Sequence, residues 1–285
     1  MKNKPVIVGV GELLWDMLPS GKKAGGAPIN FVYHASRLGA EGYAISAVGD
    51  DEPGREILSE LDRNRIGYLI EKLPYPTGTV QIELTDGIPE YTIRDRVAWD
   101  FIPPTSLAID MSEQADAICF GTLAQRHKTS RETIQAILSF ASEKAYRFFD
   151  INIRQQYYSK ELIEDSLKLC NSMKINIDEL AIIRDLFAFE GTDEFICRNL
   201  LETYNLRLLA LTAGGEYSTL YTSDAISTIP TPKVRVVDTV GAGDAFSGAL
   251  ITSLLLGASL KEAHAFAVEK AAYVCTKAGA WPAYE

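Results

Sequence analysis

The segment DTVGAGDAF, residues 238–246, joins a glycine-rich turn and a carboxylate to the start of a long apolar run. A glycine-rich turn that leads into a helix leaves backbone N–H groups without partners at the positive end of the helix dipole, where they can bind an anion. Asp244 would compete with that anion unless it has a role of its own. In phosphoryl transfer, a carboxylate can orient the acceptor hydroxyl and take its proton while N–H groups from Gly241 to Asp244 stabilise the transferring group. A purely structural alternative is that Asp244 favours the first helical turn and the glycines allow close helix packing.

Two common nucleotide-binding motifs are missing from the sequence. It contains no GxxxxGK[ST] segment, and the opening VGVGELLWD has Leu14 where a dinucleotide fingerprint needs its third glycine. The GAGD turn follows the apolar segment VRVV, residues 234–237. We therefore expect the turn at the carboxyl end of a strand, where open α/β sheets bind their ligands.

Short apolar segments alternate along the chain with segments of helical periodicity, which predicts parallel strands joined by helices. The pairs are VIVGV and INFVYHASRL, AISAV and PGREILSELDRN, AICF and SRETIQAILSFASE, and RFFDIN and KELIEDSLKLC, followed by KINI, LLALT and VRVV. We expect a mostly parallel sheet of about eight strands with helices on both faces. Gly39 and Gly67 are expected to end the first two helices, and Thr129 with Glu132 has capping-box spacing at the start of the third.

The segment TVQIELTDGIPEYTI, residues 79–93, departs from this alternation. Its apolar residues alternate with polar ones up to an Asp-Gly turn at 86–87, which predicts an antiparallel hairpin. A hairpin with one apolar face needs a partner, which could be the main sheet, a ligand or the same hairpin of a second subunit. We expect one domain that carries this hairpin as a flap.

The overall composition excludes several classes of protein. The chain has 285 residues, of which 47% are apolar, and a formal net charge of −10, so no nucleic-acid partner is expected. The four cysteines include no CxxC pair, which argues against a disulfide framework or a zinc site. No signal peptide is recognisable, and no segment approaches the ~20 apolar residues of a membrane span. We expect a cytoplasmic protein with no membrane partner.

DTVGAGDAF, taken together with GGAPINFVYHASRLG at residues 25–39, resembles the pair of signature motifs of the ribokinase-like (PfkB) family of carbohydrate kinases. The resemblance extends from GELLWD near the start of the chain to KAGAWP near its end. It implies a three-layer α/β/α domain over residues 1–285 with a mostly parallel central sheet. It also implies a small β-sheet lid from segments near 11–17 and 76–101, and transfer of a phosphoryl group from ATP to a primary hydroxyl of a sugar.

The resemblance also implies roles for residues in the chemical step. Asp244 would be the catalytic base, and Gly241, Ala242 and Gly243 would supply the anion hole. Arg154 in FDINIR would offset phosphate charge, although the third residue of that segment is isoleucine where the family commonly has proline.

The sugar site implied by the resemblance consists of Asp16, Gly25, Gly26, Asn30 and Asp244. Asp16 in GELLWD would hold two sugar hydroxyls. Glycines let hydroxyls approach the backbone, and an amide both donates and accepts hydrogen bonds. Taken from the residues alone, Gly25-Gly26 could instead be a simple turn and Asn30 a helix cap.

The residues implied for ATP are Asn176, Thr212, Gly214, Gly215 and Gly243. The segment NIDE, residues 176–179, resembles the family's NxxE element, whose Glu179 would organise Mg²⁺ through water. TAGGEY, residues 212–217, resembles the loop on which the nucleotide lies, and Asp238 resembles part of a monovalent-cation site for K⁺. Structural alternatives are a solvated helix-start acid at Glu179 and an ordinary hairpin turn at the paired glycines.

The identity of the sugar rests on two further segments. GELLWDMLP and FGTLAQR resemble the fructokinase branch, which implies phosphorylation of D-fructose at O6. Alternatives are ribose or another small sugar, and 2-keto-3-deoxygluconate, whose carboxylate would need Arg94, Arg96 or Arg126. A catalytically silent sugar or nucleotide sensor is an alternative of another class. An outward apolar face on the flap would predict a homodimer.

Overall fold

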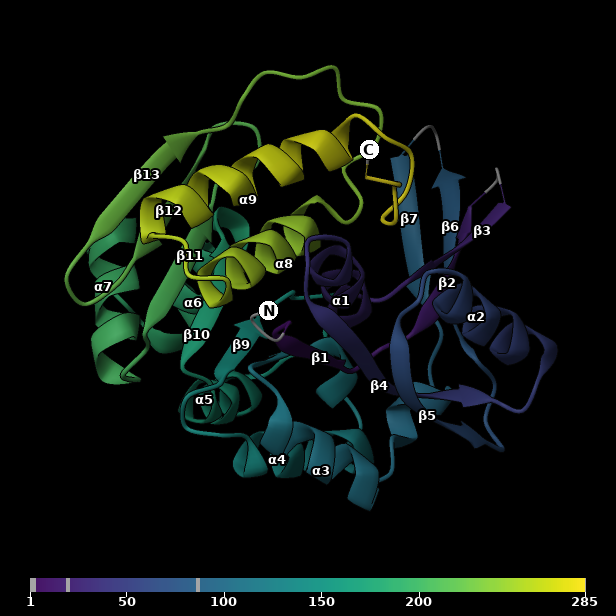
Figure 1. Cartoon of the computed structure of the whole chain (residues 1–285). Coiled ribbons are helices and arrows are strands. Elements are labelled where there is room, and N and C mark those ends of the chain that lie inside the picture. The colour runs from purple at the N-terminus through teal and green to yellow at the C-terminus, as the bar shows by residue number, and fades with distance from the viewer. Residues whose placement is uncertain (1–3, 19–20, 86–87, 285) are drawn as a thin grey trace.

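A large central sheet forms the middle layer of the molecule (Figure 1). The structure, a computed structural model, describes residues 4–18, 21–85 and 88–284. In their order across the sheet, the strands are β13 (Ile226–Pro230), β12 (Tyr217–Tyr221), β11 (Leu208–Thr212), β10 (Ser172–Asn176), β9 (Tyr146–Asp150), β8 (Ala117–Phe120), β1 (Val6–Val10), β4 (Glu41–Gly49) and β5 (Gly67–Leu73). All neighbours from β11 to β5 are parallel, and β12 and β13 add an antiparallel edge.

Helices cover both faces of this sheet. One face carries α1 (Ala27–Arg37), α2 (Glu52–Arg63), α8 (Ala242–Leu255) and α9 (Leu260–Cys275), of which α1, α8 and α9 lie side by side in Figure 1. The other face carries α3 (Ser106–Gln114), α4 (Lys128–Phe140), α5 (Lys160–Leu169), α6 (Ile177–Phe187) and α7 (Asp193–Thr203).

Each face of the sheet has its own apolar core. The helices contribute Phe31, Ile57, Leu250 and Val268 to one core and Ala108, Ile134, Ile163, Ile183 and Leu200 to the other. Strands buried on both faces have near-continuous apolar sequences, which is why AICF becomes the fully buried β8. The predicted three-layer α/β/α architecture with a mostly parallel sheet is confirmed.

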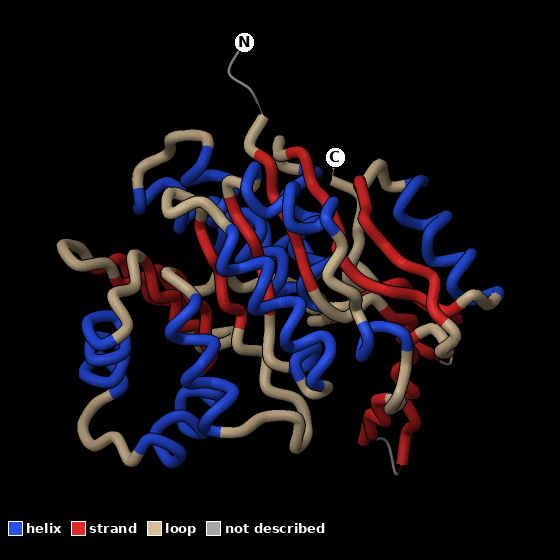
Figure 2. The backbone as a smooth tube through the Cα atoms, turned by 90° about the horizontal axis from the view of Figure 1, so that it is seen from below, coloured by secondary structure: helices blue, strands red, loops and turns tan. Residues whose placement is uncertain are grey.

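A second, smaller sheet stands apart from the main one, as Figure 2 shows. Its strands in order are β3 (Gly21–Gly25), β2 (Leu14–Leu18), β6 (Gly78–Thr85) and β7 (Ile88–Ile93). The predicted hairpin is the antiparallel pair β6–β7, and its expected Asp-Gly turn at 86–87 lies outside the described residues. β2 pairs parallel with β6 and antiparallel with β3, a strand that sequence analysis did not identify.

Some helix ends differ from expectation. Gly39 follows the end of α1 as predicted, but Gly67 begins β5, and the positive φ after α2 falls on Arg65. Helix α4 starts two residues earlier than the Thr129–Glu132 spacing indicated. Its N-cap is His127, whose Nδ1 accepts a hydrogen bond from the Thr129 N–H at 3.3 Å.

The VRVV segment is not a strand. β13 closes one edge of the nine-stranded sheet, and residues 231–240 beyond it form no strand. Val236 and Val237 are exposed, and the Val237 N–H donates to the Cys275 carbonyl at the end of α9. The apolar pattern predicted a buried strand, but in this loop Val236 and Val237 are exposed. Among the described residues, we find no helix with the length and apolar content that a bilayer crossing requires.

Candidate active site

A cleft of about 1280 Å³ separates the small sheet from the carboxyl ends of the central strands. Val80 and Ile93 line it from the small sheet, and both are only 7% exposed, so apolar side chains of this sheet face inward. The predicted site residues that line the cleft are Asp16, Gly26, Asn30, Arg154, Asn176, Glu179, Thr212, Gly214, Gly215, Asp238, Gly241, Ala242, Gly243 and Asp244. Segments from both ends of the chain therefore meet in one cleft, and of the predicted set only Gly25 lies behind its wall.

The GAGD turn forms the N-terminus of α8. Gly241 is its N-cap with φ of +79°, and a Cβ there would lie 2.7 Å from Ala280 Cβ, so both backbone and space require glycine. The Ala242 N–H already donates to the Thr239 carbonyl. Within the described chain, the N–H groups of Gly243 and Asp244 have no carbonyl partner. The Gly241 N–H likewise has no carbonyl partner there, so the anion-binding end of α8 can present three N–H groups.

Asp244 is half-buried in the cleft, where its Oδ2 accepts a hydrogen bond of 2.8 Å from Asn30 Nδ2. Burial raises the pKa of Asp244 to about 6, and the neighbouring Asp150 raises it further, whereas Asn30, Lys174 and Arg154 lower it. A carboxyl group with a pKa near neutrality is suited to accept a proton. Asp244 also joins α8 to α1 through its bond with Asn30.

Asn30 is not a helix cap, because its own N–H already bonds the carbonyl of the N-cap residue Gly26. Its side chain instead reaches from α1 to α8. The two helices approach closely because Gly248 faces α1, where a Cβ would lie 2.8 Å from the Phe31 carbonyl oxygen. A glycine within the apolar run of α8 was a sequence signal for close helix packing, but the sequence did not show which helix the glycine faced.

The paired glycines join the small sheet to α1 rather than forming a simple turn. Gly26 has φ of +116°, and a Cβ there would lie 2.0 Å from the Glu12 carbonyl oxygen. Gly25 ends β3 beneath the carboxylate of Asp16 on β2. Burial raises the pKa of Asp16 to about 6, although the positive charge of Arg154 lowers it.

Glu12 is a cleft residue that sequence analysis missed. It is 2% exposed, its Oε1 accepts the Ala27 N–H at 3.2 Å, and its Oε2 has no partner among the described residues. Burial raises the pKa of Glu12 to about 7. The available signal was an acid placed directly after the first apolar strand, since an acid in a buried position usually serves a site.

A buried ion pair lies beneath the GAGD turn and was also missed. Lys174 Nζ lies 2.8 Å from Asp150 Oδ1, and Ser247 Oγ donates to Asp150 Oδ2 at 3.0 Å. Burial disfavours the lysine charge, but the adjacent Asp150 and Glu179 outweigh it and raise the pKa of Lys174. Gly243 packs closely over this pair, because a Cβ at that position would lie 3.3 Å from Lys174 Nζ. Lysine in the apolar strand KINI was the sequence signal, because a buried charge needs a partner.

Glu179 is buried at the start of α6 rather than solvated. Its Oε2 accepts the Asn176 N–H at 3.0 Å and its Oε1 accepts the Ile153 N–H at 3.1 Å, while Asn176 Oδ1 accepts the Glu179 N–H. Burial raises the pKa of Glu179. Each carboxylate oxygen keeps a lone pair for a water molecule, so the donor set fits Mg²⁺ held through water. Within the described ranges, no group of three or more acidic, His or Cys side chains could hold a metal directly.

Asp238 organises the loop before α8. Its Oδ1 accepts the Val240 N–H at 3.0 Å, and its Oδ2 accepts the Gly279 N–H at 2.8 Å. The carboxylate thereby joins this loop to the C-terminal segment.

The other end of the cleft has apolar walls. Thr212 ends β11, and Gly214 and Gly215 form the turn into β12, so the turn predicted as an alternative is present and also borders the cleft. The remaining apolar walls come from Val234, Val236, Val240, Val268, Ala271 and Ala272. Two valines of the VRVV loop, Val234 and Val236, therefore line the cleft although the loop is not a strand.

Arg154 is the arginine that lines the described cleft. Arg154 is exposed at the cleft, and its charge lowers the pKa of each of Glu12, Asp16, Glu179 and Asp244. A single arginine therefore balances carboxylates from the small sheet, α6 and α8. Its position suits an additional anion such as a phosphate.

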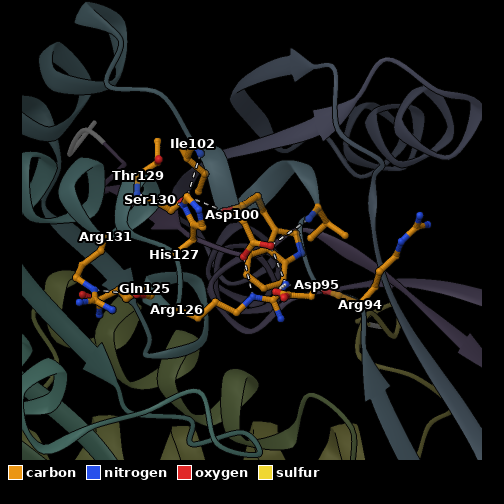
Figure 3. A network of polar contacts seen from close by, with 12 residues as sticks. Arg94, Asp95, Asp100, Ile102, Gln125, Arg126, His127, Thr129, Ser130 and Arg131 are labelled. Carbon is orange, nitrogen blue, oxygen red and sulfur yellow. Dashed lines mark hydrogen bonds and ion pairs between the residues drawn. The ribbon is translucent and has the colours of Figure 1, made fainter.

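The arginines considered for a carboxylate-bearing sugar do not line the cleft. Arg126 is paired with Asp100, with Nε at 2.7 Å from Oδ1 and Nη2 at 2.8 Å from Oδ2 (Figure 3). Its guanidinium also lies 4.1 Å from the ring centre of Trp99. Arg94 accepts from Arg126 through its carbonyl, and its side chain points away, whereas Arg96 is exposed.

Comparison with known proteins agrees with this arrangement. A sugar kinase of Pyrococcus horikoshii is 28% identical over 297 residues, covering 97% of this chain and 92% of the relative. A fructokinase of Rhizobium leguminosarum bv. trifolii is 27% identical over 264 residues, covering 87% and 79%. The crystal structure of the Pyrococcus protein has a TM-score of 0.84 and 28% identity, covering 97% of this chain and 93% of that one. Fructokinase from Xylella fastidiosa with bound ATP has the same fold, with a TM-score of 0.87 at 21% identity and coverage of 98% and 94%.

The family assignment follows from a match over most of the chain. The sequence pattern described as pfkB family carbohydrate kinase covers residues 20–284. The cleft that holds both signature motifs is where such an enzyme needs them. The chain belongs to the PfkB family of carbohydrate kinases.

Proposed function

We propose that this chain is an ATP-dependent fructokinase that transfers the γ-phosphoryl group of ATP to O6 of D-fructose, giving fructose 6-phosphate and ADP. One observation carries the proposal. The Asp244 carboxylate lies in the cleft at the N-terminus of α8, with one oxygen held by Asn30 and, beside it, N–H groups that have no carbonyl partner among the described residues. A proton acceptor and an anion-binding turn thus serve opposite sides of one reaction.

The chemical step needs two functions from α8. Asn30 holds Asp244 Oδ2, which leaves Oδ1 to accept the proton of the O6 hydroxyl as the O6–phosphorus bond forms. The bond between the γ-phosphorus and the oxygen bridging to the β-phosphate breaks, and ADP leaves with that oxygen. The N–H groups of Gly243 and Asp244, with the charges of Lys174 and Arg154 nearby, stabilise the transferring group. When bound, Mg²⁺ would neutralise phosphate charge, and Asn176 and Glu179 are the residues that would hold its water shell.

The small sheet supplies the sugar end of the site. Asp16 on β2 would accept hydrogen bonds from two sugar hydroxyls, and Asn30 would share one of them. We infer that the segments near 11–17 and 76–101 act as a lid on the single domain formed by residues 1–285. Closure over the sugar would exclude water, which limits ATP hydrolysis.

The choice of fructose rests on the named relatives. Fructokinases are among the relatives, and neighbours of the same fold bind fructose with ADP, or ATP with Mg²⁺. Arg154 is the only arginine among the described residues that line the cleft, and it lies among carboxylates. Lys23, Lys174 and Lys233 also line the cleft, so the preference for fructose over 2-keto-3-deoxygluconate rests on the fructokinases among the relatives.

The deciding experiment measures ADP release with a panel of neutral sugars and sugar acids. We expect fructose to give the highest kcat/KM and Asp244→Asn to lower kcat by about a thousand-fold while fructose still binds. Asp110→Asn, a carboxylate exposed on α3, is the matched control and should keep wild-type turnover. Tight fructose binding without turnover in the wild type would identify a sensor instead. Highest kcat/KM for a sugar acid would overturn the fructose assignment.

Two broader expectations accompany this function. We expect a cytoplasmic enzyme, since ATP is its donor. The homodimer was expected from an outward apolar face on the flap, but Val80 and Ile93 of the small sheet face the cleft instead. The edge strands β3 and β7 have no further neighbour in the described chain, and on that ground we still expect a homodimer through the small sheet. A monomer in sedimentation at micromolar concentration would contradict the dimer.

A further inference from the structure

Three side chains from distant parts of the chain form a directed line of hydrogen bonds. Trp281 Nε1 donates to Asn30 Oδ1 at 2.7 Å, and Asn30 Nδ2 donates to Asp244 Oδ2 at 2.8 Å. Trp281 belongs to the C-terminal segment, Asn30 to α1 and Asp244 to α8. The C-terminal segment is therefore one side chain away from the proposed base.

The donors and acceptors along these two hydrogen bonds can be arranged in one order only. An indole N–H is a donor and never an acceptor, whereas an ionised carboxylate is only an acceptor. An amide between them satisfies both groups only if its oxygen faces Trp281 and its NH₂ group faces Asp244. Without the indole, the amide of Asn30 could turn and place its oxygen against the carboxylate.

The indole is itself held in place by α1. Its ring stacks on Tyr33 with centroids 5.2 Å apart and planes within 4°. Tyr33 follows Asn30 by three residues, so both lie on one face of the helix. Tyr33 Oη donates to the Pro282 carbonyl at 2.7 Å, and Tyr284 Oη lies 2.7 Å from His34 Nδ1. The C-terminal segment is therefore bound along α1 and is not a loose end.

We propose that Trp281 is a positioning residue for catalysis, which fixes Asn30 as a permanent donor to Asp244 so that the free oxygen of Asp244 faces the sugar hydroxyl. This inference rests on the proposed function of Asp244. The Asn30 bond also favours the ionised form of Asp244, which opposes the effect of burial on its pKa. Loss of the fixed donor should therefore raise that pKa.

The other charges that face Asp244 stay unchanged when Trp281 is replaced. Asp150 on β9 raises its pKa, whereas Lys174 on β10 and Arg154 in the loop after β9 lower it. Glu12, at the entrance to β2, also interacts with Asp244. None of these residues contacts the indole through a hydrogen bond or an ion pair in the described structure, so a shift in the pH profile would report on Asn30.

The first test is Trp281→Phe, which keeps a ring to stack on Tyr33 and removes the N–H group. We expect kcat with fructose and ATP to fall about 5- to 20-fold, and the acid limb of the kcat profile to move to higher pH by about half a unit or more. KM for ATP should stay within about two-fold. Tyr273→Phe removes another hydroxyl bond to the C-terminal segment, at the Ala283 carbonyl, and leaves the ring and hydroxyl of Tyr33 in place. It is the matched control, and its acid limb should stay at the wild-type position.

The second test asks whether Trp281 acts through Asn30. In an Asn30→Ala background, Trp281→Phe should lower kcat by less than two-fold, because the amide that transmits its effect is gone. Equal effects of Trp281→Phe in both backgrounds would overturn the proposal, as would a wild-type kcat and pH limb in Trp281→Phe alone. Turnover that depends on Asp244 would then leave the proposed function intact. Normal turnover by Asp244→Asn would instead contradict both the proposed function of Asp244 and the proposed role of Trp281.

A third measurement needs no variant of Trp281. The Nε1–H nuclear magnetic resonance signal of Trp281 in the wild type should shift with pH as Asp244 titrates, since the two are linked through one amide. We expect that shift to disappear in Asp244→Asn. A signal that is unchanged by pH in the wild type would contradict the proposed link from Trp281 through Asn30 to Asp244, even if Trp281→Phe failed to fold.

Discussion

Gly25 lies directly beneath the carboxylate of Asp16, so close that a Cβ on Gly25 would stand 2.6 Å from Asp16 Oδ2. The two residues belong to the antiparallel pair β2–β3, in which Leu14 lies opposite Gly25. A larger residue at this position would displace the Asp16 carboxylate. Gly25 therefore acts on the proposed sugar site from behind, without lining the cleft.

Gly25→Ala should weaken sugar binding selectively. The added methyl group would push the Asp16 carboxylate away from its present position, so we expect KM for fructose to rise at least about ten-fold. KM for ATP should change by less than about two-fold and serves as the internal control, because the nucleotide end of the cleft is untouched. Steady-state kinetics with each substrate varied in turn would measure both values. An unchanged KM for fructose would show that Asp16 does not bind the sugar.

Asp244→Asn should stabilise the fold while it removes activity. The pKa of Asp244 is raised by burial to about 6 from 3.8, so the folded protein binds this proton more tightly than the unfolded chain does. The ionised carboxylate therefore costs stability above pH 6, and the cost declines as the pH falls through 6 toward 3.8. We expect the free energy of unfolding to increase by about 1–3 kcal/mol at pH 7.5 and by about half as much or less at pH 5.

Urea denaturation of the sugar-free protein at both pH values would measure this difference. Asp110→Asn, on the exposed surface of α3, is the matched control and should give no comparable gain. A loss of stability in Asp244→Asn at pH 7.5 would show that the carboxylate is better solvated, or better paired, than its surroundings indicate.

The fold could be predicted from the sequence because its signals are local and repeated. Apolar runs such as AICF and helix-period segments that alternate with them are sufficient to specify parallel strands covered by helices. The prediction of a strand at VRVV was wrong for a physical reason. Apolar residues can also line an open cleft, and a local pattern does not distinguish a cleft wall from a strand buried in a sheet.

The site could be predicted only where a motif concentrates its residues. GAGD carries an N-cap glycine, the free N–H groups and the acid within one turn, so its chemistry is readable from adjacent positions. Glu12, Lys174 and Trp281 act through partners 15 to 251 positions away, namely Ala27, Asp150 and Asn30. Contacts at such separations depend on the tertiary fold, which periodicity alone does not place at side-chain accuracy.

Lys174→Met should be strongly destabilising because it leaves the buried carboxylate of Asp150 without its cation. We expect a loss of about 3–5 kcal/mol in the free energy of unfolding. Adding Asp150→Asn should restore most of that loss, since the double variant buries no unpaired charge at this position. Lys168→Met, which removes an exposed lysine paired with Glu164, is the control and should leave stability unchanged. Additive losses in the double variant would mean that the two residues do not act as a pair.

Glu179→Gln should separate the proposed magnesium role from a purely structural one. Both oxygens of Glu179 accept backbone N–H groups, from Asn176 and Ile153, and a glutamine can accept only one of them. We therefore expect a loss of about 1–3 kcal/mol in the free energy of unfolding.

If the carboxylate also orients the water shell of Mg²⁺, the Mg²⁺ concentration for half-maximal turnover at saturating ATP should rise at least about five-fold. Asn176→Ala is the comparison for stability alone, because it breaks the other half of the same capping box and leaves the charge of Glu179 in place. A similar loss of stability in both variants, with no difference in Mg²⁺ requirement between Glu179→Gln and the wild type, would assign Glu179 to the capping of α6 alone.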